Sequence, residues 1–162
     1  MKDFIFVDVE TTGLDPRNDL LVELTYGVND GPLSTLYFGV TEVPSFIDGL
    51  IKFTERNVGS MVRATDFMLD TFRDALQGNT LVAANPSFDK SFLQENKLWT
   101  GHYRLLDVEA YAMGKLGLDF VPSLVDIRNI LTSKGYILTQ PDHSSYNDTM
   151  TLREAFNILR YI

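Results

Sequence analysis

The sequence predicts an α/β fold in which one mixed sheet of five strands is covered by helices on both faces. Three observations predict it: three strand-like segments open the chain, strand and helix patterns then alternate, and helical patterns close it. A length of 162 residues suits one ordinary domain. Because the chain has no evident repeat or linker, we expect a single domain over residues 1–162.

The first part of the chain is typical of an antiparallel meander of three strands. Residues 4–9 form a short β-branched and aromatic run, as expected for a strand covered on both faces. Apolar runs over residues 20–28 and 33–40 follow, separated by the turn sequence Asn-Asp-Gly-Pro. The mixed stretch 44–59 predicts a short helix and a loop.

Helices dominate the rest of the chain. Apolar residues recur at helical spacing, and glycine or proline marks several of the expected helix ends. Two short apolar runs between these helices predict the fourth and fifth strands. The expected helices cover residues 65–76, 87–96, 109–116, 123–134 and 147–160, and the two expected strands cover residues 80–84 and 104–108.

Composition excludes several classes of protein. Hydrophobic residues make up 44% of the chain and charged residues 22%, which is typical of a folded globular protein and not of a disordered one. The chain has no cysteine and two histidines, which excludes a disulfide framework, a thiolate zinc site and a histidine-rich zinc site. We expect no membrane span and no signal peptide, and hence a cytoplasmic protein of a bacterium or a virus-infected host cell.

The net charge of −8 is at first sight unsuited to binding a polyanion. Divalent cations bound where carboxylates converge would offset the repulsion, because each cation adds two positive charges. An acidic surface that only maintains solubility is the simpler alternative. The charge therefore makes a carboxylate metal site worth seeking without establishing one.

The strongest local pattern is the segment Asp-Val-Glu-Thr-Thr-Gly-Leu, residues 8–14, at the end of the first expected strand. Side chains alternate along a strand, so Asp8 and Glu10 point to the same face. Two adjacent carboxylates repel each other unless a cation lies between them, and oxygen ligands suit Mg²⁺ or Mn²⁺. A bare Asp-x-Glu pair is more often an ordinary polar strand end, but the full string is far more specific.

Two further patterns follow in order. Asn85-Pro-Ser-Phe88-Asp89 comes directly after the fourth expected strand and opens a helix. His143 and Asp148 have the spacing His-x₄-Asp at the start of the last helix, and the alternative Tyr-x₃-Asp spacing is absent because Met150 lies four residues after Tyr146. Each pattern alone has a structural explanation as a helix start.

Together the three patterns resemble the motifs of the DEDD 3′→5′ exonucleases of the histidine subtype, the family that includes bacterial proofreading exonuclease subunits and oligoribonuclease. The resemblance extends from Asp8 to Asp148 and implies a ribonuclease H-like fold. Pro86 within the second motif is a departure from the family pattern, and Ser145 is a tolerable small residue after the histidine.

The resemblance also implies a chemistry. Four carboxylates would hold two Mg²⁺ or Mn²⁺ ions about 3.5–4 Å apart, and His143 would act as the general base that activates water. The terminal nucleotide of a single-stranded DNA 3′ end would contact the first two motifs and leave as a nucleoside 5′-monophosphate. The implied metal ligands are Asp8, Glu10, Asp89 and Asp148, and the implied substrate contacts are Thr11, Thr12, Leu14, Asn85 and Phe88.

Several alternatives stay open. The same chemistry would serve an exoribonuclease that trims RNA or degrades short oligoribonucleotides. A non-catalytic module that binds 3′ ends or a polymerase is a weaker alternative, because all five motif positions are intact. A stand-alone nuclease and a DNA polymerase subunit are equally open. Asp107, at a strand end, either supports the site or caps the next helix.

Overall fold

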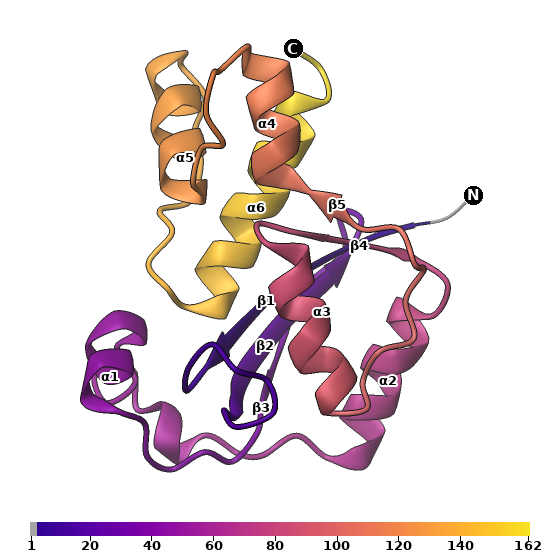
Figure 1. The fold of residues 1–162 in the computed structure, drawn as a ribbon, viewed down its shortest axis with the longest axis vertical. Helices are drawn as coiled ribbons and strands as arrows, with labels where there is room; N and C mark the ends of the chain where they lie inside the picture. Colours follow the sequence, from indigo (N-terminus) through magenta and orange to yellow (C-terminus); the bar gives the residue numbers. More distant parts are fainter. Residues whose placement is uncertain (1–2) are drawn as a thin grey trace.

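The structure, a computed structural model, describes residues 3–162, and Met1 and Lys2 lie outside the described residues. A five-stranded sheet with the strand order β3-β2-β1-β4-β5 runs through it (Figure 1). The α/β class and the mixed five-stranded sheet are confirmed. The strands are β1 (Phe4–Thr11), β2 (Leu21–Val28), β3 (Ser34–Tyr37), β4 (Thr80–Ala83) and β5 (Leu106–Asp107).

The sheet combines an antiparallel half with a parallel half. β1 pairs with β2, and β2 with β3, in antiparallel register, which confirms the predicted meander. β4 lies parallel to both β1 and β5. β5 is shorter than the expected strand over 104–108, because Asp107 already serves as the N-cap of the following helix, where its side chain accepts a hydrogen bond from the Ala110 amide.

The predicted helices are present with small shifts of their ends. The last helix begins two residues before the expected start, because Ser144 caps it by accepting a hydrogen bond from the Asn147 amide. The helices are α1 (Ser45–Ile51), the 3₁₀ helix η1 (Val58–Ser60), α2 (Asp66–Leu76), α3 (Pro86–Glu95), α4 (Val108–Leu116), α5 (Leu124–Ser133) and α6 (Ser145–Leu159). In residues 3–162, no helix is long and apolar enough to cross a membrane.

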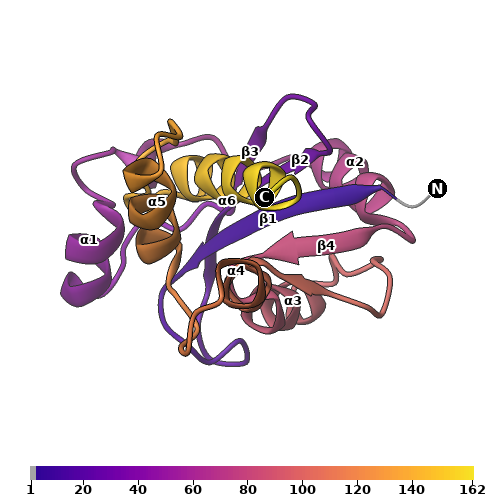
Figure 2. The same cartoon turned by 90° about the horizontal axis from the view of Figure 1, so that it is seen from above.

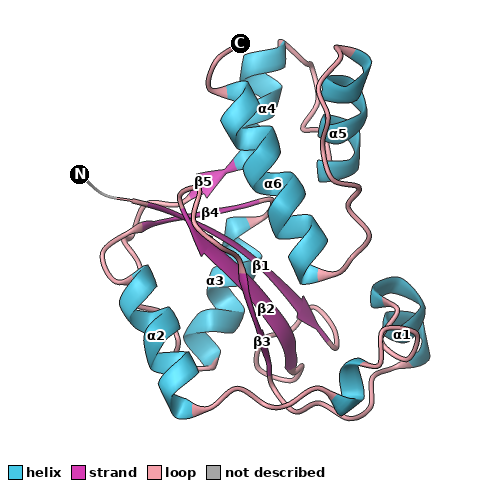
Figure 3. Cartoon of the chain, turned by 180° about the vertical axis from the view of Figure 1, so that it is seen from behind, coloured by secondary structure: helices cyan, strands magenta, loops and turns pink. Residues whose placement is uncertain are grey.

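Helices cover both faces of the sheet, with α2 and α3 on one side and α4, α5 and α6 on the other (Figure 3). Alternation along β1 divides its side chains between the two cores. Ile5, Val7 and Val9 pack toward α2 and α3, whereas Phe6 packs toward α4, α5 and α6. Asp8 and Glu10 follow Phe6 on this second face, so β1 carries two carboxylates toward the N-terminus of α6.

Candidate metal and nucleic-acid site

Three carboxylates converge at the end of β1. Asp8, Glu10 and Asp148 each offer an oxygen atom, and these atoms lie within 4.8 Å of one another. Asp148 belongs to the first turn of α6, which packs across β1. The strand alternation and the helix start therefore bring together residues that are about 140 positions apart.

Asp89 lies beside this group without being part of it. It sits in the first turn of α3 and is 4% exposed. Its Oδ1 accepts a hydrogen bond from the Val9 amide at 3.2 Å, which ties α3 to the strand between Asp8 and Glu10. The structure thus brings three of the four expected ligands into one cluster and places the fourth against the backbone that carries two of them.

Burial raises the pKa values of these carboxylates, and neighbouring charges add to the effect at Asp8 and Glu10. Burial raises the pKa of Asp8 well above its usual value, and the charges of Glu10, Asp89 and Asp148 raise it further. Burial, with Asp148 and Glu23, raises the pKa of Glu10 to about 9. Burial also raises the pKa of Asp89 to about 7, and it raises the pKa of Asp148 above its usual value. Proteins hold carboxylates this close together where a cation balances them.

A divalent cation fits this donor set. Asp8 Oδ2 is buried and has no hydrogen-bond partner among the described residues. An unpartnered buried carboxylate oxygen is costly, and coordination to a metal satisfies it. Because all three clustered donors are carboxylate oxygens, the set suits Mg²⁺ or Mn²⁺ rather than a thiophilic metal.

His143 lies on a short, tightly bonded loop before α6. Its backbone has a φ of 60°, in the left-handed region, and its amide donates a hydrogen bond to Asp148 Oδ1 at 3.2 Å. The amide of Asp142 donates to the same oxygen at 2.9 Å. The histidine ring is exposed and lines a cavity together with Asp8 and Asp148. The general-base candidate therefore faces the same space as the candidate metal ligands.

Two residues that the sequence analysis did not single out organise this loop and its helix. Asp142 accepts hydrogen bonds from the amide and hydroxyl of Ser144 and from the side chain of Asn147. Glu23, fully buried on β2 directly opposite Glu10, accepts a hydrogen bond from the Ser145 amide at 2.8 Å. The Asp-x-Ser spacing could have identified Asp142 as a loop-forming residue, whereas nothing local marks Glu23.

An apolar cavity of about 410 Å³ opens beside Glu10, and we call it the apolar cavity. One wall is the end of β1 and its turn, where the side chain of Leu14 is 85% exposed. Phe88 of α3 and residues of α1 complete the lining. Among the expected substrate contacts, Thr11, Thr12, Leu14 and Phe88 line this cavity, whereas Asn85 does not.

The Thr-Thr-Gly turn is shaped by its own hydrogen bonds. The amide of Thr12 donates to the Leu20 carbonyl, and its hydroxyl receives the Leu20 amide at 2.8 Å. A Cβ on Gly13 would collide with the Asp19 carboxylate, which would have to shift away from its bonds to the Thr12 hydroxyl and the Asp15 amide. Thr11 is buried and bonds the Gly13 carbonyl. Both threonine hydroxyls therefore serve to form the wall of the apolar cavity.

A second cavity, of about 210 Å³, lies on the other side of Asp8. His143, Asp148 and Glu109 line it. Glu109 is a carboxylate that the sequence motifs do not include; it accepts a hydrogen bond from the Leu124 amide at 2.9 Å, and burial raises its pKa to about 7. The carboxylate cluster thus lies between two cavities, the apolar cavity and a smaller, more acidic one.

Sequence comparison finds relatives among nucleic-acid enzymes, although no family model matches the chain. The chain is 30% identical over 131 residues to an oligoribonuclease of Mycobacterium leprae, an alignment that covers 67% of this chain and 61% of the relative. It is 28% identical over 104 residues to a PolC-type DNA polymerase III of Clostridium perfringens, covering 61% of this chain and 7% of the polymerase. The chain therefore spans less than two thirds of either relative.

Structural comparison finds the same fold in exonuclease I of Escherichia coli. One structure of this enzyme superposes with a TM-score of 0.71 at 14% identity, covering 98% of this chain and 40% of the other. The zinc-bound complex of the same enzyme with single-stranded DNA gives a TM-score of 0.69, with the same coverage. These structural similarities confirm the expected fold, and the two sequence relatives bear out the resemblance that the three motifs predict.

Proposed function

We propose, from the resemblance of this chain to the DEDD 3′→5′ exonucleases in motifs, relatives and fold, that it is a metal-dependent 3′→5′ exonuclease domain. Its substrate would be single-stranded DNA, from which it would release nucleoside 5′-monophosphates. The observation that carries the proposal is the convergence of Asp8, Glu10 and Asp148 around an unpartnered carboxylate oxygen, next to the ring of His143.

The residues divide the work by position. Asp8, Glu10 and Asp148, with Asp89 beside them, would hold two Mg²⁺ or Mn²⁺ ions. Bound divalent ions supply charge neutralisation at the phosphate and a lowered pKa for bound water. His143 would accept the proton of the attacking water, whose oxygen bonds to phosphorus while the bond from phosphorus to the 3′ oxygen of the preceding nucleotide breaks.

The apolar cavity, which we call the nucleoside cavity from here on, would receive the terminal nucleoside. Leu14 and Phe88 offer apolar surfaces that accept any base, since every base has a stackable face. Stacking of this kind contributes about 1–3 kcal/mol per base. The adjoining turn of Thr11 and Thr12 would set the depth to which the sugar enters.

RNA is the second candidate substrate, and the similarity to an oligoribonuclease favours it. Discrimination would depend on contacts to the 2′-hydroxyl. The similarity to part of a PolC-type DNA polymerase III supports a DNA polymerase subunit as a partner, with a role in DNA replication or repair.

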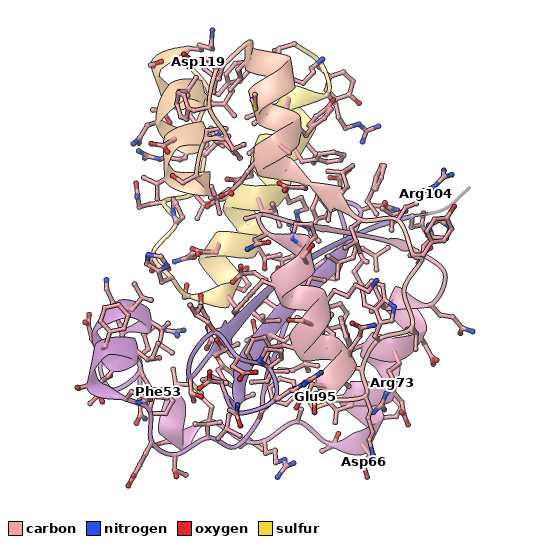
Figure 4. The ribbon with its side chains drawn as sticks, in the orientation of Figure 1. Phe53, Asp66, Arg73, Glu95, Arg104 and Asp119 are labelled. Carbon is pink, nitrogen blue, oxygen red and sulfur yellow. The ribbon has the colours of Figure 1, made fainter. Side chains whose placement is uncertain are left out.

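A gel assay tests the proposal. A 5′-labelled single-stranded DNA and an RNA of the same sequence are incubated with Mg²⁺ or with EDTA. We expect a ladder that shortens from the 3′ end in Mg²⁺, is absent in EDTA, and is lost in Asp8→Asn and His143→Ala. Asp66→Asn is the control that should retain activity. Asp66 is an exposed residue at the start of α2, at the lower edge of Figure 4.

The ratio of DNA to RNA degradation would identify the preferred substrate. A folded protein that binds 3′ ends but degrades neither strand in Mg²⁺ or Mn²⁺ would contradict the proposed activity and favour a non-catalytic binding module.

A further inference from the structure

Helix α1 forms the outer wall of the nucleoside cavity. Figures 1 and 2 show α1 at the edge of the molecule, apart from the helices that cover the sheet. Phe46 and Leu50 of α1 line the cavity opposite the β1 turn, and their side chains are 78% and 39% exposed. The position of α1 therefore decides how wide this cavity is.

An arginine joins α1 to the sheet by polar contacts. Arg56, five residues after the end of α1, donates from Nε to the Ile51 carbonyl at 2.8 Å. Its two terminal nitrogens lie 3.1–3.2 Å from the carboxylate oxygens of Glu23. Arg56 thus bonds the C-terminal end of α1 with one nitrogen and the buried carboxylate of β2 with the others.

Glu23 links this contact to the carboxylate cluster. It lies directly across the strand pair from Glu10, and its Oε1 also accepts the Ser145 amide at the start of α6. The same carboxylate therefore contacts the segment that follows α1 and the helix that carries Asp148. A planar guanidinium fixes both distance and orientation in a way that an ammonium group does not.

We propose that Arg56 is a positioning residue which, through Glu23, holds α1 in place as the wall of the nucleoside cavity and so sets the affinity for the terminal base. Arg56 does not line the cavity, so it acts through α1. This inference rests on the proposed function, because it assigns the terminal base to that cavity.

The apolar contacts beneath α1 lack the directionality that the arginine supplies. Ile51, Phe53, Val58 and Val22 form a small buried cluster, and Ile47 of α1 also packs against it. Such contacts are non-directional, whereas the hydrogen bonds of a guanidinium group fix an orientation. Phe46 lies at the N-terminal end of the helix, where a small rotation moves the cavity wall most.

The test combines a change in the protein with a change in the substrate. Arg56→Lys keeps the positive charge but loses the planar two-point contact. The substrates are a single-stranded oligomer and the same oligomer whose 3′-terminal residue lacks a base. For each combination of protein and substrate, kcat/KM is measured in Mg²⁺. Kd is measured in EDTA by fluorescence anisotropy.

We expect Arg56→Lys to reduce kcat/KM about tenfold on the ordinary oligomer, through KM, and less than about twofold on the oligomer without the terminal base. Phe46→Ala, which changes an exposed side chain and leaves the ion pair intact, should reproduce this pattern. Equal losses on both substrates, or no loss on either, would overturn the inference, because a purely structural role does not depend on the base.

Arg73→Lys is the matched control. Arg73 likewise donates from Nε to a backbone carbonyl and pairs with a carboxylate, but it lies on α2, across the molecule from Phe53 in Figure 4. Arg73→Lys should change neither kcat/KM nor Kd for either substrate. If the wild-type protein binds the ordinary oligomer more tightly than the oligomer without the terminal base but cleaves neither, the proposed function is contradicted. The Kd values of Arg56→Lys would then still decide the role of Arg56.

Discussion

At the scale of single residues, Asp8 is the position where stability and the proposed activity conflict most. Its carboxylate is buried among Glu10, Asp89 and Asp148, and one of its oxygens has no partner within residues 3–162. Without a cation, this arrangement places like charges together in a poorly solvated space. The proposed metal site explains why such a group stands at the end of an otherwise well-packed strand.

Asp8→Asn should stabilise the protein in EDTA while it abolishes activity. An amide of the same shape removes one buried charge and adds a donor for the neighbouring carboxylates, so we expect the free energy of unfolding to rise by about 1–2 kcal/mol. Activity in Mg²⁺ should fall at least about a hundredfold. Thermal unfolding and the gel assay measure the two effects, and an unchanged or lower Tm in EDTA would contradict this account of the cluster.

At the scale of elements, the loop before α6 fixes the general-base candidate. Asp142 bonds both Ser144 and Asn147, and this cap holds His143 in a left-handed backbone conformation that non-glycine residues adopt at a cost. The start of α6 therefore positions His143 and Asp148 together.

Asp142→Ala should lower kcat by about tenfold or more, because His143 is no longer held beside Asp148. The loss of the helix-capping contacts should cost about 1 kcal/mol of stability. Thr65→Ala removes a comparable cap from α2 and should cost similar stability without changing kcat. Equal kcat values for the two variants would show that the loop contacts matter only for stability.

Much of the fold and of the site follows from local sequence patterns. Strand alternation predicts that Asp8 and Glu10 share a face, and capping rules place Asp148 at a helix start. The Glu23–Arg56 pair could not be predicted in this way, because its members are 33 positions apart and neither stands in a local pattern. The length of β5 also escaped prediction, since Asp107 is needed as a helix cap.

At the scale of the whole molecule, the clustered carboxylates should make stability depend on pH when metal is absent. The folded-state pKa values of Glu10, about 9, and Asp89, about 7, exceed their ordinary values of 4.5 and 3.8. The stabilisation that protonation gives is present at low pH and is lost as the pH rises through these values.

We therefore expect Tm in EDTA to fall between pH 6 and pH 9. Mg²⁺ should raise Tm, and should raise it more at pH 9 than at pH 6, because protons and metal compete for the same oxygens. Thermal unfolding across this range, with and without Mg²⁺, checks the expectation. A Tm in EDTA that stays constant or rises with pH would contradict the raised pKa values of Glu10 and Asp89 in the folded protein.

The proposed site would direct water to the terminal phosphodiester and release a nucleoside 5′-monophosphate. The most direct measurement is mass spectrometry of the first mononucleotide released from single-stranded DNA in H₂¹⁸O with Mg²⁺. We expect one ¹⁸O atom in the 5′-phosphate of that mononucleotide and a free 3′-hydroxyl on the shortened strand. A released nucleoside without phosphate, with the ¹⁸O on a 3′-phosphate of the remaining strand, would contradict the proposed activity.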